Sequence, residues 1–597
     1  MDQFLERYLG LFCIVAVLLC TTPARAQLPT APEVASYQMN VRLDPAAKTV
    51  GGTAQITYRN PSEDTLDELW LRLYLKAFSS TDSLWIRESG GQLRGDELDP
   101  DNLGDIDLQS LRVVGGGDLL ASATLTDTLL RVPLETPLGG GQSIELAMTW
   151  LSTLPRVFAR TGYGGRDDTF FMVGQWYPKM AVYDRGRWDT EPWHGNSEFF
   201  NDFGNYDVTI TLPQEYVVAG AGVPQGEVAN ADGTKTARFS ANSVTDFAFA
   251  ASPDFKTAST KAGDITVDLF YLPEHEGAVQ EYLDSAAGTL TTLGQWFGAY
   301  PHPRLTVVDV PDNATGAGGM EYPTLVTTEY GVAGFPAYVT SHEVAHQWWP
   351  MQTATNEGAE PWLDEGLTEY SGARYIAESG YRIGGTIGIG ARAFERANYL
   401  ALDPAQPATL PAWQYSSNDY AIVYSKTALG LWTLENQVGS ERFRGAMRSY
   451  LDTWRFKHPQ GADFRRSMEQ SLGPQPWFFD QYMPTNGVID YTVDEIRGNE
   501  ATLSREGQVA APVEIVVTLQ NGTREIEQWD GANETFTLTT DGPIAQVQID
   551  PNQKLTAEID LDNNISATSV PLLPALTLGE RLVFWFQSFA QVFGLFG

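Results

Sequence analysis

The sequence predicts a multidomain α+β protein in which β-rich outer parts flank a helical middle part. With 597 residues, the chain is long enough for three or four domains of ordinary size. Its hydrophobic periodicity changes twice, from the alternation of strands to the spacing of helices and back again. Gly, Pro, Asn and Asp punctuate the two outer parts at the short intervals typical of strands joined by turns. We therefore expect three folded domains.

The two outer domains are expected to be β structure. From residue 27 to residue 254 the chain carries alternating apolar runs, for example residues 69–75 and 206–212, which predict an N-terminal β-sheet domain. Between residues 486 and 565, shorter runs such as residues 512–519 recur at the spacing of a small C-terminal β-sandwich domain.

The middle domain, residues 255–485, is predicted to be mainly helical. Apolar residues recur at helical spacing over residues 279–297, 441–454 and 463–472. The histidine and glutamate residues that could carry out chemistry lie between these stretches. The sequence therefore predicts that this is the catalytic domain.

A pattern typical of a catalytic zinc site, His-Glu-Val-Ala-His, spans residues 342–346. Residues four apart share one face of a helix, so His342 and His346 can direct two imidazoles at one metal, while Glu343 reaches the same cleft as a base. Glu365, in a second helical stretch, is expected to be the third ligand, which leaves a fourth position for water. The pattern predicts a metallohydrolase with one Zn²⁺ per chain. The alternative is an amphipathic helix with solvated His and Glu residues.

The surroundings of this pattern resemble the zinc signature of the aminopeptidase N family, in the thermolysin-like gluzincin group. Eighteen residues separate His346 from Glu365, and the signature includes Gln-Trp-Trp at 347–349 and Trp-Leu-Asp-Glu-Gly at 362–366. The resemblance covers residues 31–565 and implies a β domain, a thermolysin-like α/β catalytic domain and a small β domain. Many members add a helical superhelix that caps the cleft. This chain is too short for one, and a more open site is expected.

A second family motif lies upstream of the zinc pattern. Gly318, Gly319, Met320 and Glu321, followed by Tyr322, are similar to the Gly-x-Met-Glu-Asn element, which in the family lies along the substrate. The resemblance implies that Glu321 binds the free amino terminus of a peptide. Such a charge-assisted contact would fix the number of residues to the scissile bond. Tyr322 replaces the usual Asn. Without the zinc pattern, these residues would indicate only a turn into a strand.

A tyrosine is expected to complete the catalytic residues, because attack of water on an amide creates an oxyanion that needs a donor besides zinc. Tyr424 lies 59 residues after Glu365 in the sequence Tyr-Ser-Lys-Thr, which is similar to the family's Tyr-x-Lys-Gly. The resemblance implies that Tyr424 stabilises the oxyanion. Tyr420, one helical turn earlier, is the alternative, and a core tyrosine with a satisfied hydroxyl is the structural alternative.

Two weaker expectations concern the surroundings of the site. Gln175, in the sequence Gly-Gln-Trp-Tyr-Pro, resembles the loop by which the family's first domain helps to bind the substrate amine. Glu369 could bind the outer nitrogen of a zinc-bound histidine, although a solvated helix position is the favoured interpretation. The other histidines are expected to be structural or at the surface; they are His194, His275, His302 and His458.

Residues 1–26 are predicted to be a cleaved signal peptide. An apolar run at residues 9–20 precedes Ala-Arg-Ala at 24–26, a cleavage pattern, and is too short to span a bilayer comfortably. An uncleaved anchor is the alternative, because the charged region before the run is not clearly positive. Both cysteines, Cys13 and Cys20, fall in this leader, so no disulfide is expected in the mature protein. We expect export to the periplasm or out of the cell.

Charge and the C-terminal tail bear on the expected partners. A net charge of −36 predicts a soluble chain that repels nucleic acid, so nucleic-acid binding is set aside. The aromatic-rich tail at residues 566–597 would be amphipathic as a helix, and it could lie on a membrane surface or pack on the protein. The oligomeric state is not predicted.

Together these observations predict an exported zinc aminopeptidase that acts on peptides with a free N-terminus. A zinc endopeptidase, or an epoxide hydrolase on the same scaffold, is the enzymatic alternative, and Glu321 argues against the endopeptidase. A catalytically inactive peptide-binding module is the other alternative. The complete set of ligands, base and candidate tyrosine argues against it.

Overall fold

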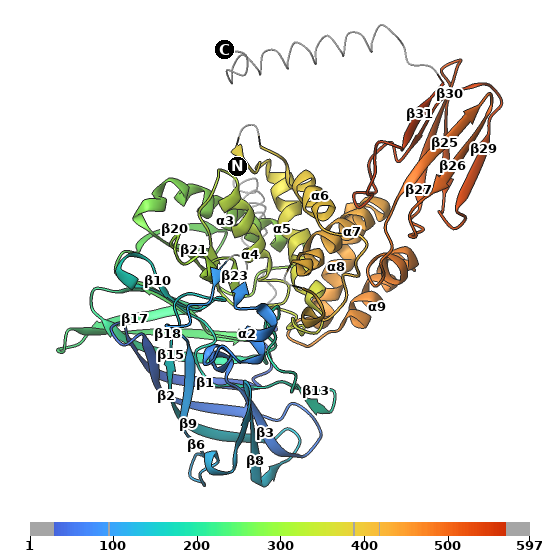
Figure 1. Ribbon diagram of the computed structural model, residues 1–597. Helices are drawn as coiled ribbons and strands as arrows, with labels where there is room; N and C mark the ends of the chain where they lie inside the picture. The colour runs from blue at the N-terminus through green and yellow to red at the C-terminus, as the bar shows by residue number, and fades with distance from the viewer. Residues whose placement is uncertain (1–28, 94–95, 386–387, 417, 569–597) are drawn as a thin grey trace, which may run out of the picture.

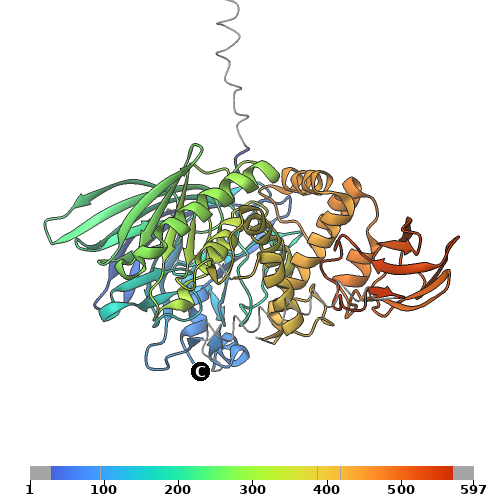
Figure 2. The same cartoon turned by 90° about the horizontal axis from the view of Figure 1, so that it is seen from above.

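The computed structural model describes residues 29–93, 96–385, 388–416 and 418–568, so the predicted leader and most of the predicted tail lie outside the described residues. Over the described residues the chain is a mixed α/β structure with many sheets, in agreement with the predicted α+β class. Figures 1 and 2 show strands of the N-terminal part, then helices, then strands of the C-terminal part, arranged side by side along the molecule.

The N-terminal part consists mainly of strands. They are β1 (Ala35–Asp44), β2 (Thr49–Arg59), β3 (Leu66–Arg72), β4 (Gln92–Leu93), β5 (Asp96–Glu97), β6 (Asp105–Val113), β7 (Thr124–Thr126), β8 (Leu129–Leu138), β9 (Ser143–Thr153), β10 (Gly162–Gly164), β11 (Phe170–Val173), β12 (Lys179–Met180), β13 (Tyr183–Asp184), β14 (Arg187–Trp188), β15 (Gly204–Pro213), β16 (Val217–Gly220), β17 (Val223–Ala229), β18 (Thr234–Val244) and β19 (Phe249–Ser252). The largest layer is a seven-stranded sheet in the order β17-β18-β15-β1-β2-β9-β6, with β1 parallel to β15. Two four-stranded sheets, β10-β11-β19-β16 and β12-β3-β8-β7, lie beside it. Along β1 the buried Tyr37, Met39 and Val41 alternate with exposed residues, so one face of the strand packs in the core.

One predicted strand is shorter than expected. The apolar run at residues 69–75 predicts a single strand, but β3 ends at Arg72 and a short 3-10 helix follows over Tyr74–Phe78. The apolar side chains of this helix are all buried. An apolar run enclosed on every side has no period that distinguishes a strand from a helical turn, so the prediction was wrong at its C-terminal end.

The middle part has one mixed sheet and most of the helices. The strands are β20 (Lys256–Ala262), β21 (Ile265–Tyr271), β22 (Arg304–Asp309), β23 (Met320–Tyr322) and β24 (Leu325–Thr328). The helices are α3 (Val279–Trp296), α4 (Phe335–Ala345), α5 (Glu365–Ser379), α6 (Ala391–Ala401), α7 (Ile422–Val438), α8 (Ser440–Trp454) and α9 (Gly461–Leu472). The sheet order is β20-β21-β22-β24-β23, with β21, β22 and β24 parallel. Helices α3, α8 and α9 lie on the three stretches that the sequence predicts to be helical.

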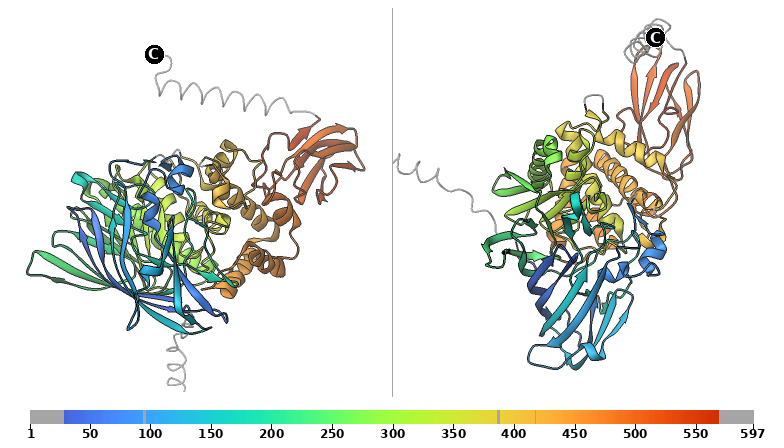
Figure 3. Two further views of the ribbon diagram at one scale, coloured as in Figure 1. Left: turned by 60° about the horizontal axis from the view of Figure 1, so that its bottom comes forward. Right: turned by 60° about the vertical axis from the view of Figure 1, so that its left-hand side comes forward.

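The C-terminal part returns to strands, in two sheets. The strands are β25 (Tyr491–Arg497), β26 (Glu500–Arg505), β27 (Val513–Leu519), β28 (Arg524–Trp529), β29 (Thr535–Thr539), β30 (Ile544–Ile549) and β31 (Ile565–Ala567). Their orders are β25-β26-β29 and β28-β27-β30-β31. Figure 3 shows these strands at the end of the molecule beyond the helices. None of the helices in the described part of the chain has the length and apolarity that crossing a bilayer requires.

Two hydrophobic cores join neighbouring parts of the molecule. The core of the N-terminal strands extends to Met320, Tyr322 and Leu325, so the edge strand β23 packs on the N-terminal part. The core of the helices continues into the C-terminal strands, from Leu429 on α7 to Val547 on β30. The sheet and helices of the middle part therefore pack on neighbouring parts at both ends.

Candidate metal centre and catalytic cavity

Two neighbouring helices carry the predicted metal ligands. His342 lies near the C-terminal end of α4, His346 is the residue that follows this helix, and Glu365 is the first residue of α5. The helices approach closely because α5 has a glycine at the contact. A Cβ atom at Gly372 would lie only 3.2 Å from the Cα atom of His342. The packing of α5 against α4 thus brings together His346 and Glu365, which have eighteen residues between them in the sequence.

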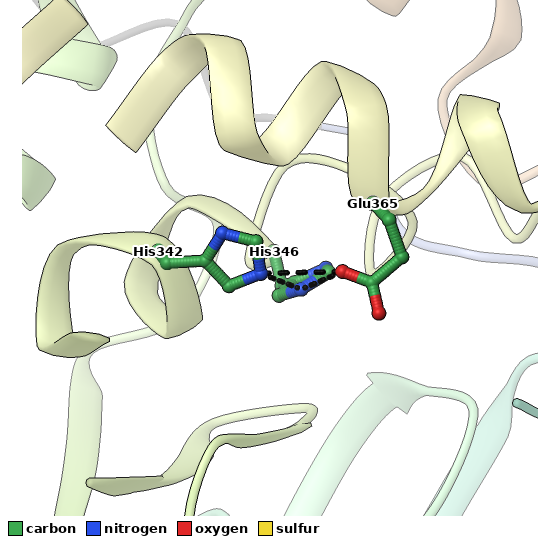
Figure 4. A group of neighbouring side chains, drawn as sticks. All are labelled: His342, His346 and Glu365. Atoms are coloured by element: carbon green, nitrogen blue, oxygen red, sulfur yellow. Dashed lines mark hydrogen bonds and ion pairs between the residues drawn. The ribbon is translucent and has the colours of Figure 1, made fainter. Parts of the chain in front are cut away.

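The three side chains point toward one another, as Figure 4 shows. The Nε2 atom of His342 lies 3.1 Å from Nε2 of His346 and 3.2 Å from Oε2 of Glu365, and the third side of this triangle is 3.3 Å. Tetrahedral zinc with bonds of about 2.0–2.2 Å separates its ligand atoms by roughly 3.3–3.6 Å, close to the distances observed here. Two nitrogens and one carboxylate oxygen are also ligands that zinc prefers. The residues present therefore fit a zinc ion.

The outer ring nitrogens of the two histidines have different partners. Nδ1 of His342 lies 2.6 Å from Oε2 of Glu369, which is only 4% exposed. The favoured sequence interpretation of Glu369 as a solvated helix residue was therefore wrong, because the contact with an imidazole compensates for its burial. Nδ1 of His346 lies 2.9 Å from Oδ1 of Asp364, 2.9 Å from the carbonyl oxygen of Trp349 and 3.1 Å from Oγ1 of Thr368.

The electrostatics of the centre divide the buried carboxyls into two kinds. Burial raises the pKa of Glu365, but the two imidazoles more than offset this effect and hold it well below its ordinary value. Burial raises the pKa of Glu343 to about 8, although His342 and His346 act in the opposite direction. Glu365 is thus suited to ligate a cation, whereas Glu343 is suited to exchange a proton near neutral pH.

A cavity of about 530 Å³ opens beside the three ligands. Its lining includes Glu343, Glu321 and Gly319, together with apolar side chains of α4 and α6. One carboxylate oxygen of Glu321 lies within 4.8 Å of a ring nitrogen of His346. Gly319 has a φ of +61°, a conformation that favours glycine and lets the backbone turn into β23.

Two other residues of the predicted substrate strand do not line this cavity. Met320 is buried in the core of the N-terminal part. Gly318 packs against a neighbouring side chain, since a Cβ atom there would lie 2.4 Å from Cγ of Glu329. Among the five predicted substrate-binding residues, the structure places Gly319 and Glu321 at the cavity, and the roles of the others stay predictions.

Tyr424 reaches the metal centre from α7. Its hydroxyl group donates a hydrogen bond to Oε1 of Glu365, and its ring stacks on that of His342 with the centroids 5.8 Å apart. Tyr420 also lines the cavity, with its ring centroid 6.0 Å from that of Tyr424. Helix α7 approaches α5 this closely because Gly366 lacks a side chain: a Cβ atom there would lie 2.4 Å from Cγ2 of Thr427.

The side chain of Gln175 binds two residues that do not line the cavity. Its side-chain amide donates to Asp246 at 3.2 Å and accepts from Nζ of Lys179 at 2.7 Å. The preceding residue, Gly174, packs against Tyr322, where a Cβ atom would lie 1.9 Å from the hydroxyl oxygen. The loop therefore contacts β23, but the side chain of Gln175 is not among those that line the cavity, so its role at the substrate amine stays a prediction.

Three side chains at the centre were missed from the sequence. Asp364 directly precedes the ligand Glu365, and this position in the sequence could have indicated that it lies near the metal centre. Tyr338 lies one helical turn before His342, on the same face of α4, which could have indicated the same. Glu395, on α6, is buried in the cavity wall. Nothing in its local sequence indicates that position.

Comparison with known proteins gives one family and several relatives. The protein-family model described as "Peptidase family M1 domain" matches residues 281–482 of this chain. A probable aminopeptidase 2 of Sulfurisphaera tokodaii is 24% identical over 233 residues, which cover 37% of this chain and 30% of that protein. Aminopeptidase N of Oryctolagus cuniculus is 25% identical over 289 residues, covering 40% of this chain and 28% of that protein. A solved structure, of a mutant M1 zinc metallopeptidase from Deinococcus radiodurans, has a TM-score of 0.54 at 17% identity over 77% of this chain and 97% of that one.

The three donor residues lie within the segment that the Peptidase family M1 model matches, and the fold is similar to that of a solved M1 zinc metallopeptidase. The match to the M1 peptidase family covers residues 281–482, about a third of the chain, and agrees with the resemblance seen in the sequence. The matched segment spans only 30% and 28% of the two curated relatives, so the activity and substrates of this protein are inferences.

Proposed function

We propose that the protein is a zinc-dependent aminopeptidase that removes N-terminal residues from peptides. The observation that carries the proposal is the position of Glu321, whose carboxylate lies within 4.8 Å of a ring nitrogen of His346 in the cavity of the metal centre. A carboxylate so close to the reacting bond would bind the substrate ammonium and leave room for one residue between them. The names of the relatives as aminopeptidases support the same substrate class.

The proposed mechanism assigns a role to each polar group. His342, His346 and Glu365 would hold zinc, which when bound supplies a Lewis acid that polarises the carbonyl and lowers the pKa of water. Glu343 accepts a proton from the attacking water and donates it to the leaving amine. Its pKa of about 8 would fall toward neutrality beside a bound cation, which suits both transfers. The hydroxyl group of Tyr424 donates a hydrogen bond to the oxyanion.

Further parts of the proposal concern organisation and location. We infer a division into domains at residues 27–254, 255–485 and 486–565, and export directed by residues 1–26. The tail at residues 566–597 is proposed to contact a membrane surface. Recovery of the native protein outside the cytoplasm with Gln27 at its N-terminus would support export and cleavage. A mature chain that still begins at Met1 would contradict cleavage.

The decisive experiment compares aminoacyl-anilides with their N-acetylated counterparts, with and without a zinc chelator. We expect chelator-sensitive cleavage of the free-amine substrates only. Replacing Glu321 by Ala should remove most of this activity, whereas Glu321→Gln should retain part of it, because an amide oxygen still accepts a hydrogen bond but attracts an ammonium less strongly.

Two outcomes would overturn the proposal. Equal cleavage of the blocked and free substrates would make the protein an endopeptidase. Tight zinc binding without cleavage of either series, across a panel of side chains, would favour the peptide-binding module.

A further inference from the structure

Four polar side chains from four helices meet behind His342, on the side of its ring away from the metal donors. They are Tyr338 on α4, Glu369 on α5, Glu395 on α6 and Ser425 on α7, and all of them line the cavity of the metal centre. Each residue comes from a different helix, so the cluster is not a local sequence motif. The packing of the domain creates it.

The contacts in this cluster form a continuous path from α6 to His342. The hydroxyl group of Tyr338 lies within hydrogen-bonding distance of Oε1 of Glu395 and of Oε1 of Glu369. The second oxygen of Glu369 lies 2.6 Å from Nδ1 of His342. On the far side, Oγ of Ser425 donates to Oε2 of Glu395 at 3.2 Å. Glu395 is thus three contacts away from His342, a proposed metal ligand.

The number of protons explains why the two carboxyl groups can lie so close together. Tyr338 has one hydroxyl proton, so it can donate to only one of the two carboxyls. The second close contact requires a proton on a carboxyl group. Glu395 is 1% exposed, and burial, followed by the nearby charge of Glu369, raises its pKa well above the ordinary value. Glu395 therefore supplies the second proton and acts as a donor within the cluster.

We propose that Glu395 is a positioning residue for the metal centre: through Tyr338 it holds Glu369 against Nδ1 of His342 and so fixes the direction of the Nε2 ligand atom. The inference rests on the proposed zinc site, but it does not depend on the substrate. Outer partners of metal-bound histidines set the orientation of the ring, and their loss typically weakens metal binding by about 10- to 100-fold. Here the outer partner has a further partner that the zinc motif does not contain.

Helix α6 is itself bound to the C-terminal part. The guanidinium of Arg396, the residue after Glu395, donates to the carbonyl oxygens of Glu558 and Ile559 in the C-terminal part. The C-terminal strands thus support the helix that carries the positioning carboxyl group. This contact gives α6 the fixed position that the role of Glu395 requires.

The test measures zinc affinity by chelator competition and records the visible spectrum of the cobalt-substituted protein. We compare Glu395→Leu, which keeps the volume but removes the donor, with Glu395→Gln, which can still donate. The Leu variant should raise the Kd for zinc by up to about 10-fold, the lower end of the effect of a direct outer partner, and should shift the cobalt bands. The Gln variant should stay close to the wild type on both measures.

A double-mutant cycle separates positioning from general damage to the fold. In a Glu369→Ala background the Leu substitution should change the Kd no further, because its path to His342 has already been removed. Additive effects, or a Leu variant with unchanged affinity and spectrum, would overturn the inference. A wild-type protein that binds neither zinc nor cobalt would instead overturn the proposed metal site. Thermal unfolding of each variant, compared with Asn398→Ala on the next turn of α6, shows whether the helix has lost its structure.

Discussion

The two histidines of the metal centre have similar inner surroundings but different outer ones. His346 faces the Trp349 carbonyl oxygen and Asp364, from the chain segment between the two ligand helices, and the hydroxyl group of Thr368 in the first turn of α5. His342 instead faces Glu369, whose other oxygen leads through Tyr338 to a separate helix. The orientation of His346 is therefore fixed locally, whereas that of His342 depends on the packing of α6. One sequence pattern thus specifies two ligands that have different structural support.

The largest expected effect is that of replacing Glu343, which lies between the two histidines in the sequence and is not an outer partner of either ring. Glu343→Gln should lower the turnover of aminoacyl-anilides by about 10²- to 10⁴-fold, the usual contribution of a general base. Zinc affinity should stay close to that of the wild type, because Glu343 is not among the three ligand residues. Steady-state kinetics and zinc titration on the same preparation test both statements. A variant that loses zinc together with activity would show that Glu343 also supports the metal.

The difference between the two outer environments is tested directly by Glu369→Ala and Thr368→Ala. Loss of the carboxylate behind His342 should weaken zinc binding by about 10- to 100-fold. Loss of the Thr368 hydroxyl should have a much smaller effect, since the Trp349 carbonyl oxygen and Asp364 still face His346. Chelator competition on the two variants, which differ at adjacent positions of α5, gives the comparison. Equal losses would show that both rings depend on their outer partners to the same extent.

The sequence predicted the local part of this site and missed the part made by packing. His342, Glu343 and His346 share a helical face, so their meeting follows from the geometry of one helix. Glu369 was interpreted as solvated, because charged side chains are seldom fully buried unless they are paired, and its partners come from other helices. Glu395 could not have been found at all, since only the packing of α6 brings it to the cavity.

The same limit applies to the fold. Long periodic stretches such as residues 279–297 gave correct helices, because amphipathic spacing is a property of the segment itself. The run at residues 69–75 gave a strand that was too long, since complete burial removes the polar side that would reveal the period. The sequence thus identifies elements with one solvated face better than elements that are enclosed.

A smaller effect is expected from the support of α6. Arg396→Met keeps most of the apolar stem but removes the donors to the Glu558 and Ile559 carbonyl oxygens, and it should lower the free energy of unfolding by about 1–2 kcal/mol. It should also raise the Kd for zinc by less than Glu369→Ala does. Arg392→Met, one turn earlier with a 3.4 Å contact to Gln553 and an exposed side chain, is the matched control. If both variants unfold like the wild type, α6 does not depend on the C-terminal part.

The smallest effect concerns a histidine that has carboxylate partners but no role in the centre. Nδ1 of His275 lies 2.8 Å from Asp309 and its Nε2 atom lies 3.3 Å from Asp312. Burial lowers the pKa of His275, but the two aspartates reverse this effect and raise it above the ordinary 6.5. Because the folded-state pKa is the higher one, the protonated ring stabilises the fold below about pH 6.5, and this contribution is lost as the pH rises through the folded-state value.

Thermal unfolding of His275→Gln should therefore differ most from that of the wild type near pH 6, and the difference should shrink toward pH 9. His302 provides the contrast, because burial alone lowers its pKa to about 4. The contribution of His302 to stability should be present above about pH 6.5 and should fall as the pH approaches 4. The stability of His302→Gln should therefore rise relative to that of the wild type as the pH falls. If the stability of the two variants, relative to the wild type, changed in the same direction with pH, a carboxylate partner would not determine the protonation of a buried histidine in this fold. The pairing of His342 with Glu369 would then lose its electrostatic basis and retain only its geometric one.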